Sequence, residues 1–164
     1  MRKTGSIILG VLITSIANAQ SPCNSPEASQ FDFWFGHWNL TWNDTSKGTN
    51  FIDKMMDGCT IHEHFNDPAT NFRGESWSVY NPQQKKWQQT WVDNQGGYIV
   101  LTGGMQGDEM ILTTEEQKLT TGSKISRMVF YNIKKDSFDW RWEASTDDGK
   151  SWKVNWLIHY MRAK

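Results

Sequence analysis

The sequence has little excess charge, few cysteines and no long apolar segment beyond its N-terminus. Its 164 residues carry 17 basic and 18 acidic side chains and form no basic face, which argues against a nucleic-acid partner. After residue 36 no stretch has a helical period of useful length, and no internal repeat or linker divides the chain. These absences argue against a helical or multidomain protein and indicate one domain with one core.

Motifs that identify common enzymes are also missing. The chain contains no nucleophile elbow, no phosphate-binding loop and no cysteine–histidine pairing. Ser76 and Ser78 have no recognisable base nearby, and the acidic pairs at 115–116 and 147–148 fall in predicted turns. We therefore expect a protein that is not an enzyme. A small hydrolase or isomerase is the alternative, because a fold alone does not define a reaction.

The N-terminus has the features of a secretory signal. Arg2 and Lys3 precede an apolar run over 7–16, and residues 17–19 are Ala-Asn-Ala, a small-x-small cleavage site. The run is shorter than the roughly 20 residues that span a bilayer. We expect a signal peptide over 1–19, cleavage after Ala19, and a secreted or periplasmic domain over 20–164. Without Arg2 and Lys3, 15 basic residues remain against 18 acidic, a net charge of −3.

Only two cysteines are present, Cys23 and Cys59. In an oxidising compartment we expect them to form one disulfide that ties the N-terminal segment to a later strand. A loop of 36 residues gives about 3–4 kcal/mol of stabilisation in the chain-entropy model. Two free thiols are the alternative.

Ten short runs alternate between apolar and polar residues, the period of a half-buried strand. Turn-forming residues such as Asn81-Pro82 and 147–150 separate the runs, and connections this short permit only antiparallel neighbours. Closing such a meander removes its exposed edges. The sequence therefore predicts an all-β fold, a closed antiparallel up-and-down β-barrel of about ten strands. The expected strands are approximately 37–43, 48–57, 59–66, 72–80, 86–93, 97–103, 107–114, 123–133, 137–145 and 152–162.

The stretch at 31–42, FDFWFGHWNLTW, gathers six aromatic residues and Leu40 around the start of the first strand. Before it, Ser25 and Pro26 are typical of the N-cap and first position of a helix, which can run to about Phe33. We expect this short N-terminal helix and the aromatic residues after it to plug one end of the barrel. Any ligand site should then lie at the opposite, open end.

Gly36-His37-Trp38, after this short lead-in, resembles the Gly-x-Trp signature of lipocalins and the wider calycin superfamily. The resemblance implies that Gly36 and Trp38 belong to the closed end and that Arg162, from the last strand, packs against Trp38. Over residues 31–162 the chain also resembles the bacterial domain-of-unknown-function 1579 family, which implies a lipocalin-like barrel, commonly exported, with no established reaction. The motifs that carry this resemblance are FDFWFGHW at 31–38, DGCTIHE at 57–63, QTWVDN at 89–94 and STDDGKSW at 145–152.

Ten tryptophans in a chain of this size indicate either an aromatic-lined cavity or a filled barrel. Glu63 shares a strand face with Ile61 and Phe65, so its carboxylate should point into the lumen and needs a partner, for which Arg127 and Gln89 are candidates. Our first hypothesis is a barrel that binds a small hydrophobic or aromatic molecule. An envelope structural or interaction protein with a filled barrel is the alternative. The expected ligand-binding residues are Glu63, Trp77, Gln89, Trp91, Asp93, Arg127 and Trp142.

The histidines offer other sites. His62 and His64 share a strand face at a spacing that can chelate zinc or copper, and His37 or His159 could supply a third ligand only if the fold brings it close. The alternative is that both simply face solvent. His159 lies where ten-stranded barrels of the nitrobindin type hold haem, although the pattern of the last strand turns it outward unless the register slips by one residue. The sequence predicts no cofactor, with haem or a transition metal as alternatives.

Overall fold

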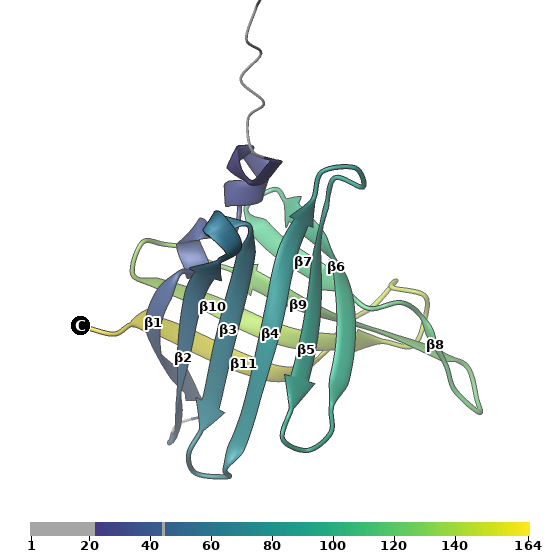
Figure 1. Ribbon diagram of the computed structural model, residues 1–164. Helices are drawn as coiled ribbons and strands as arrows, with labels where there is room; N and C mark the ends of the chain where they lie inside the picture. The colour runs from purple at the N-terminus through teal and green to yellow at the C-terminus, as the bar shows by residue number, and fades with distance from the viewer. Residues whose placement is uncertain (1–21, 44) are drawn as a thin grey trace, which may run out of the picture.

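The computed structural model describes residues 22–43 and 45–164, so the predicted signal peptide lies outside the described residues. Ten of its strands form one antiparallel sheet that closes into a barrel (Figure 1). None of the helical segments in the described ranges has the length and apolar character needed to span a membrane. The elements in chain order are η1 (Pro22–Asn24), η2 (Glu27–Ser29), η3 (Asp32–Trp34), β1 (Gly36–Trp42), β2 (Ser46–Met55), η4 (Met56–Gly58), β3 (Thr60–Asp67), β4 (Phe72–Asn81), β5 (Lys86–Asp93), β6 (Tyr98–Gln106), β7 (Glu109–Thr113), β8 (Gln117–Lys118), β9 (Ser123–Tyr131), β10 (Ser137–Ser145) and β11 (Lys153–Arg162).

The strands follow one another around the barrel in chain order. β1 to β7 pair as neighbours, β7 pairs with β9, and β9 continues through β10 and β11. The barrel closes where β11 pairs with β1, which sets Trp38 opposite Arg162 and Leu40 opposite Tyr160. The two-residue β8, which was not predicted, pairs with β9. Each of the ten predicted runs contains a strand, and the predicted all-β, closed, antiparallel barrel is confirmed.

Three 3-10 turns, rather than one continuous helix, occupy the segment before β1. The Ser25 hydroxyl accepts a hydrogen bond from the Ala28 N–H at 3.2 Å, as an N-cap would, but the backbone leaves the helical conformation at Phe31. Phe31 and Trp34 are fully buried in the core, and the Phe31 ring meets Trp87 edge-on with centroids 4.8 Å apart. The segment lies over one end of the barrel (Figure 1).

One disulfide joins Cys23 to Cys59, with Cα atoms 4.9 Å apart, which confirms the predicted pairing. It ties the turns before β1 to the start of β3. A second contact on this side is the ion pair between Lys54 and Asp32, whose Nζ and Oδ1 atoms are 2.6 Å apart. The N-terminal segment is therefore held by a covalent bond, an ion pair and buried aromatic contacts.

Arg162 joins the two ends of the closed sheet. Its guanidinium lies over the Trp38 ring, with Cζ 4.2 Å from the ring centroid. Gly36, at φ +112°, leaves space for this side chain, since a Cβ there would lie 2.8 Å from Arg162 Nη1. The guanidinium donates hydrogen bonds of 2.9–3.3 Å to the carbonyls of Phe33, Phe35 and Lys135.

The Arg162→Ala variant is expected to lower the free energy of unfolding by about 2 kcal/mol, because three carbonyls lose a charged donor and Trp38 loses its cation contact. Arg162→Lys should restore little of this loss, since an ammonium group does not reproduce the planar fork. Urea denaturation measures both. Lys153→Ala, at the exposed other end of β11, is the control and should change stability by less than about 0.5 kcal/mol. If Arg162→Ala loses as little stability as Lys153→Ala, the stabilising role given to Arg162 is contradicted.

Candidate functional site

A cavity of about 180 Å³ lies inside the barrel, and its wall is largely aromatic. Five of the ten tryptophans line it, together with Tyr160 and several aliphatic residues. Among the described residues no lysine, arginine or histidine lines the cavity; its only acidic side chains are those of Glu63 and Asp93. The barrel is therefore not filled. The lining tryptophans are Trp34, Trp91, Trp140, Trp142 and Trp156.

Small residues on the inner face of β4 make room for this aromatic wall. Gly74, Ser76 and Ser78 point inward, and the two serines are fully buried. A Cβ on Gly74 would clash with the Trp91 ring of the neighbouring strand β5. This phase turns Trp77 to the outer face, where it is 38% exposed, so its predicted place in the ligand site is wrong.

Glu63 points into the barrel, as its shared face with Ile61 and Phe65 predicted, and only 6% of it is exposed. The Asn50 side-chain amide donates to Oε1 at 2.7 Å, and the Ser76 hydroxyl donates to Oε2 at 2.5 Å. Burial raises the pKa of Glu63 from 4.5 to about 7, against the opposing effect of these two hydrogen bonds. A carboxyl with this pKa changes protonation near neutral pH inside an apolar wall.

The expected partners of Glu63 are elsewhere. Arg127 lies on the outer face of β9, where its Nε donates to Glu143 at 2.6 Å and its guanidinium lies over the Trp152 ring. Gln89 is buried, but it donates to Ser78 at 2.9 Å and does not line the cavity. The predicted pairing of Glu63 with Arg127 or Gln89 is therefore wrong, and Asn50 and Ser76 take their place.

Two further residues of the cavity wall, Tyr160 and Trp34, carry buried polar groups. The Tyr160 hydroxyl accepts a hydrogen bond from the Asn50 amide at 3.3 Å, and burial raises its pKa above the ordinary value of 10. Trp34 lines the cavity, and its indole N–H has no hydrogen-bond partner among the described residues. A buried, unpaired donor is costly unless a ligand or water accepts its hydrogen bond.

Asp93 marks the end of the cavity away from the N-terminal turns. Its carboxylate accepts hydrogen bonds from Trp91 Nε1 at 3.0 Å and from the N–H groups of Gly97 and Gln95 at 2.8 and 2.9 Å. Desolvation raises the pKa of Asp93, but these hydrogen bonds outweigh it and bring the pKa below its ordinary value. The carboxylate therefore holds the Trp91 ring in place and fixes the β5–β6 turn. Of the seven predicted ligand-binding residues, four line the cavity: Glu63, Trp91, Asp93 and Trp142.

Alternation and aromatic content alone do not reveal several of the residues at this site. The sequence places Trp34 in the plug and gives no ligand-binding role to Trp140, Trp156 or Tyr160. Asn50 gave no signal, because its contact with Glu63 depends on the β2–β3 register, which sets Asn50 opposite Phe65 and Ile52 opposite Glu63. The composition of the site therefore depends on the register between neighbouring strands, which the sequence alone does not predict.

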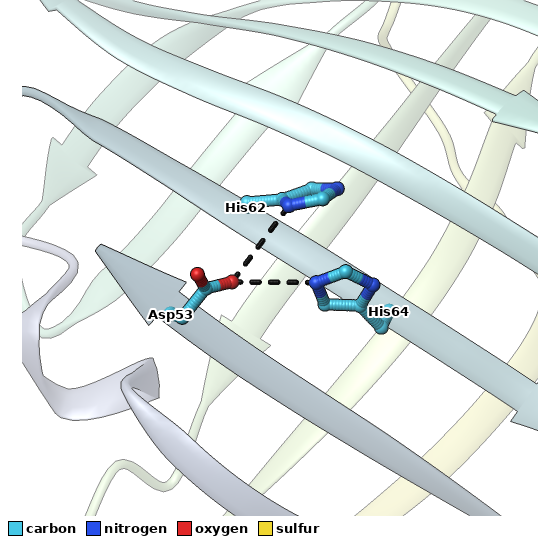
Figure 2. Close-up of side chains that lie close together, drawn as sticks. All are labelled: Asp53, His62 and His64. Atoms are coloured by element: carbon cyan, nitrogen blue, oxygen red, sulfur yellow. Dashed lines mark hydrogen bonds and ion pairs between the residues drawn. The ribbon is translucent and has the colours of Figure 1, made fainter. Parts of the chain in front are cut away.

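The outer face of the barrel carries a second cluster. His62 and His64 on β3 lie beside Asp53 on β2 (Figure 2), and the ligand atoms of the three residues are within 4.8 Å of one another. The third residue of this group is thus Asp53, and neither His37 nor His159 belongs to it. His37 stacks on Phe51, with ring centroids 4.3 Å apart.

His159 points away from the lumen. Its Nδ1 lies 2.6 Å from Asp139 Oδ1 on the outer face, and its side chain is about half exposed. The outward orientation expected from the β11 pattern is the one observed, so this histidine does not face the cavity that a haem would have to occupy.

Comparison with protein-family models and with curated proteins found no match to the chain.

Proposed function

We propose that this protein is an exported, lipocalin-like barrel of the domain-of-unknown-function 1579 type that binds one small aromatic molecule in its internal cavity. The observation that carries the ligand proposal is a cavity inside the barrel with a largely aromatic wall that includes the buried carboxyl of Glu63. The closed ten-stranded barrel supports the family, and the Cys23–Cys59 disulfide is compatible with an oxidising compartment.

The volume sets the size of the ligand. An apolar protein cavity of about 150 Å³ is large enough for benzene. The cavity here, about 180 Å³, therefore suits one aromatic ring with a small substituent and is too small for haem, a retinoid or a long fatty acid. Flat rings can stack or meet edge-on with the tryptophans of the wall.

The polar groups set the chemistry of the substituent. A fatty-acid or other carboxylate ligand would find no cation among the described lining residues and would meet Glu63 and Asp93. A hydroxyl group suits the site, because it can donate its hydrogen to the carboxyl of Glu63, which lines the cavity. The proposed ligand class is a neutral phenol or a similar small hydroxylated aromatic molecule.

Fluorescence titration tests this proposal, because half of the tryptophans line the cavity. Phenol is expected to change the emission saturably, with a Kd on the order of 0.1 mM for so small a ligand, whereas laurate should give no saturable change. Ile99→Trp, which fills the cavity from β6, should weaken phenol binding at least about tenfold. Val100→Trp is the matched control, because Val100 is the next residue on the same strand and is 47% exposed.

Both variants should be checked for an unchanged circular dichroism spectrum before the comparison. Equal phenol affinity in the two variants would place binding outside the cavity and contradict the proposal. The absence of saturable binding by phenol and indole in the wild-type protein would also reject it.

A further inference from the structure

The register of three strands brings two histidines and two carboxylates together on the outer face of the barrel. Asp53 on β2 lies opposite His62 on β3, and His64 lies opposite Glu75 on β4. All four side chains point away from the lumen, on the face opposite to Glu63. This cluster is separate from the cavity and has no part in the binding function proposed above.

The distances define a three-ligand set. Asp53 Oδ1 lies 3.3 Å from His64 Nε2 and 3.7 Å from His62 Nδ1. Dashed lines in Figure 2 mark these two contacts. Two imidazole nitrogens and a carboxylate oxygen that face one another are the donor types that Zn²⁺ takes in sites with three protein ligands and an open position. Small rotamer changes bring these atoms from their present spacing to ligand distances of about 2 Å from a shared ion.

Glu75 supplies the carboxylate that orients a metal-binding histidine. Its Oε2 lies 2.9 Å from His62 Nε2, the ring nitrogen on the side away from Asp53. A proton held on Nε2 by this hydrogen bond leaves the Nδ1 lone pair directed toward Asp53. Carboxylate–histidine pairs of this kind fix the tautomer and ring orientation of metal ligands.

The imidazoles are also held by aromatic neighbours. Trp77 stacks on His62, with centroids 4.7 Å apart and ring planes 16° apart. Phe51 stacks on His64, with centroids 5.5 Å apart and ring planes 20° apart. Because both rings are constrained before any ion binds, less side-chain entropy is lost on binding. Trp77, which faces outward, is therefore part of this histidine cluster and not of the cavity.

The charge and the access of the cluster suit a cation. Within the described ranges, the ion pairs of Asp53 and Glu75 involve only His62 and His64, and Arg73, which lines the adjoining groove, pairs with neither carboxylate. A groove lined by His64, Glu75 and neighbouring residues opens beside the cluster to solvent. An ion can therefore enter, and water can fill the open coordination position.

From this geometry we propose that the outer face of β2–β3–β4 holds a zinc site in which Asp53, His62 and His64 are the protein ligands, a water molecule is the fourth ligand and Glu75 orients His62. Cu²⁺, which binds imidazole sites more tightly than Zn²⁺, should compete for the same ligands. The site is a surface metal centre, independent of the aromatic cavity.

Isothermal titration calorimetry of the chelator-treated full protein with ZnCl₂ tests the proposal. We expect one Zn²⁺ per chain, with affinity reduced at least about tenfold in His64→Ala and Asp53→Asn and about 10–100-fold in Glu75→Gln. His159→Ala is the matched control, because His159 also pairs with a carboxylate on the outer face but has no second histidine in its group. This variant should bind Zn²⁺ as the wild type does.

A second measurement keeps the result independent of folding effects. Cu²⁺ should quench part of the tryptophan emission in the wild type, and Trp77→Phe, which keeps a ring over His62, should lose that part while still binding Zn²⁺. The proposal is overturned if Zn²⁺ does not bind stoichiometrically, or if His159→Ala weakens binding as much as His64→Ala does. Unchanged affinity in Asp53→Asn would likewise remove Asp53 from the ligand set and refute the site.

Discussion

The free energy of unfolding of the Glu63→Gln variant, relative to that of the wild type, is expected to rise by about 3 kcal/mol as the pH is raised from about 4 to about 8. Burial raises the pKa of Glu63 from 4.5 to about 7. Each pKa unit corresponds to about 1.4 kcal/mol, so this difference corresponds to about 3 kcal/mol. Urea denaturation at a series of pH values measures the free energy of unfolding of both proteins.

The direction of this pH dependence follows from whether the folded or the unfolded state holds the Glu63 proton. Between pH 4.5 and about pH 7 the folded protein keeps the Glu63 proton that the unfolded chain has released. The contribution of Glu63 to stability is therefore fully present below pH 4.5 and is lost as the pH rises through about 7. Glutamine does not titrate, so the stability difference between the variant and the wild type should grow across this window and stay constant outside it.

Asp93→Asn is the control of opposite sign. Hydrogen bonds hold the pKa of Asp93 below its ordinary value of 3.8, so its stabilisation is present above pH 3.8 and is lost as the pH falls through its folded pKa. A chelator in all samples keeps metal ions away from His62 and His64, which are common to all the proteins compared. If the stability difference between Glu63→Gln and the wild type does not vary with pH, the raised pKa of the buried Glu63 carboxyl is contradicted.

Local patterns in the sequence were enough to predict the barrel. Alternation marked all ten long strands, and turn residues between them allowed only antiparallel neighbours, so the order of strands followed without long-range information. The inward direction of Glu63 also followed from its shared face with Ile61 and Phe65. The N-terminal helix was predicted less well, because three short 3-10 turns satisfy the same capping residues while bringing Phe31 and Trp34 into the core.

The candidate site was less predictable, because it depends on strand phase and register. On β4, hydrophobicity alone places Trp77 inside, but the close approach of Trp91 to Gly74 requires the small residues to face inward. The pairing of Asp53 with His62 depends on the β2–β3 connection, where Met56 and Asp57 take positive φ values of 52° and 57°. A methionine rarely takes a positive φ, so the sequence does not define this connection, and the partners of Glu63 and the third residue of the histidine cluster were missed.

Replacing both Cys23 and Cys59 with serine is expected to lower the free energy of unfolding by about 4 kcal/mol. The disulfide closes a loop whose ends are 36 residues apart, and the chain-entropy model assigns a cross-link of this length about that much stabilisation, through the unfolded state. Guanidinium denaturation of the oxidised wild type, the reduced wild type and the double variant measures the loss. The reduced wild type should lose about as much as the double variant.

The native segment should stay in place without the disulfide, because other contacts hold it. Phe31 and Trp34 are fully buried, and the Trp87 indole N–H donates to the Glu27 carbonyl at 3.2 Å. Trp34 also lines the cavity, so phenol binding reports on the position of this segment. If the double variant loses stability but keeps its phenol affinity, the disulfide stabilises the protein by restricting the unfolded chain and not by shaping the cavity. A parallel loss of phenol binding would contradict this and show that the disulfide holds the aromatic segment, and with it one wall of the cavity, in the folded barrel.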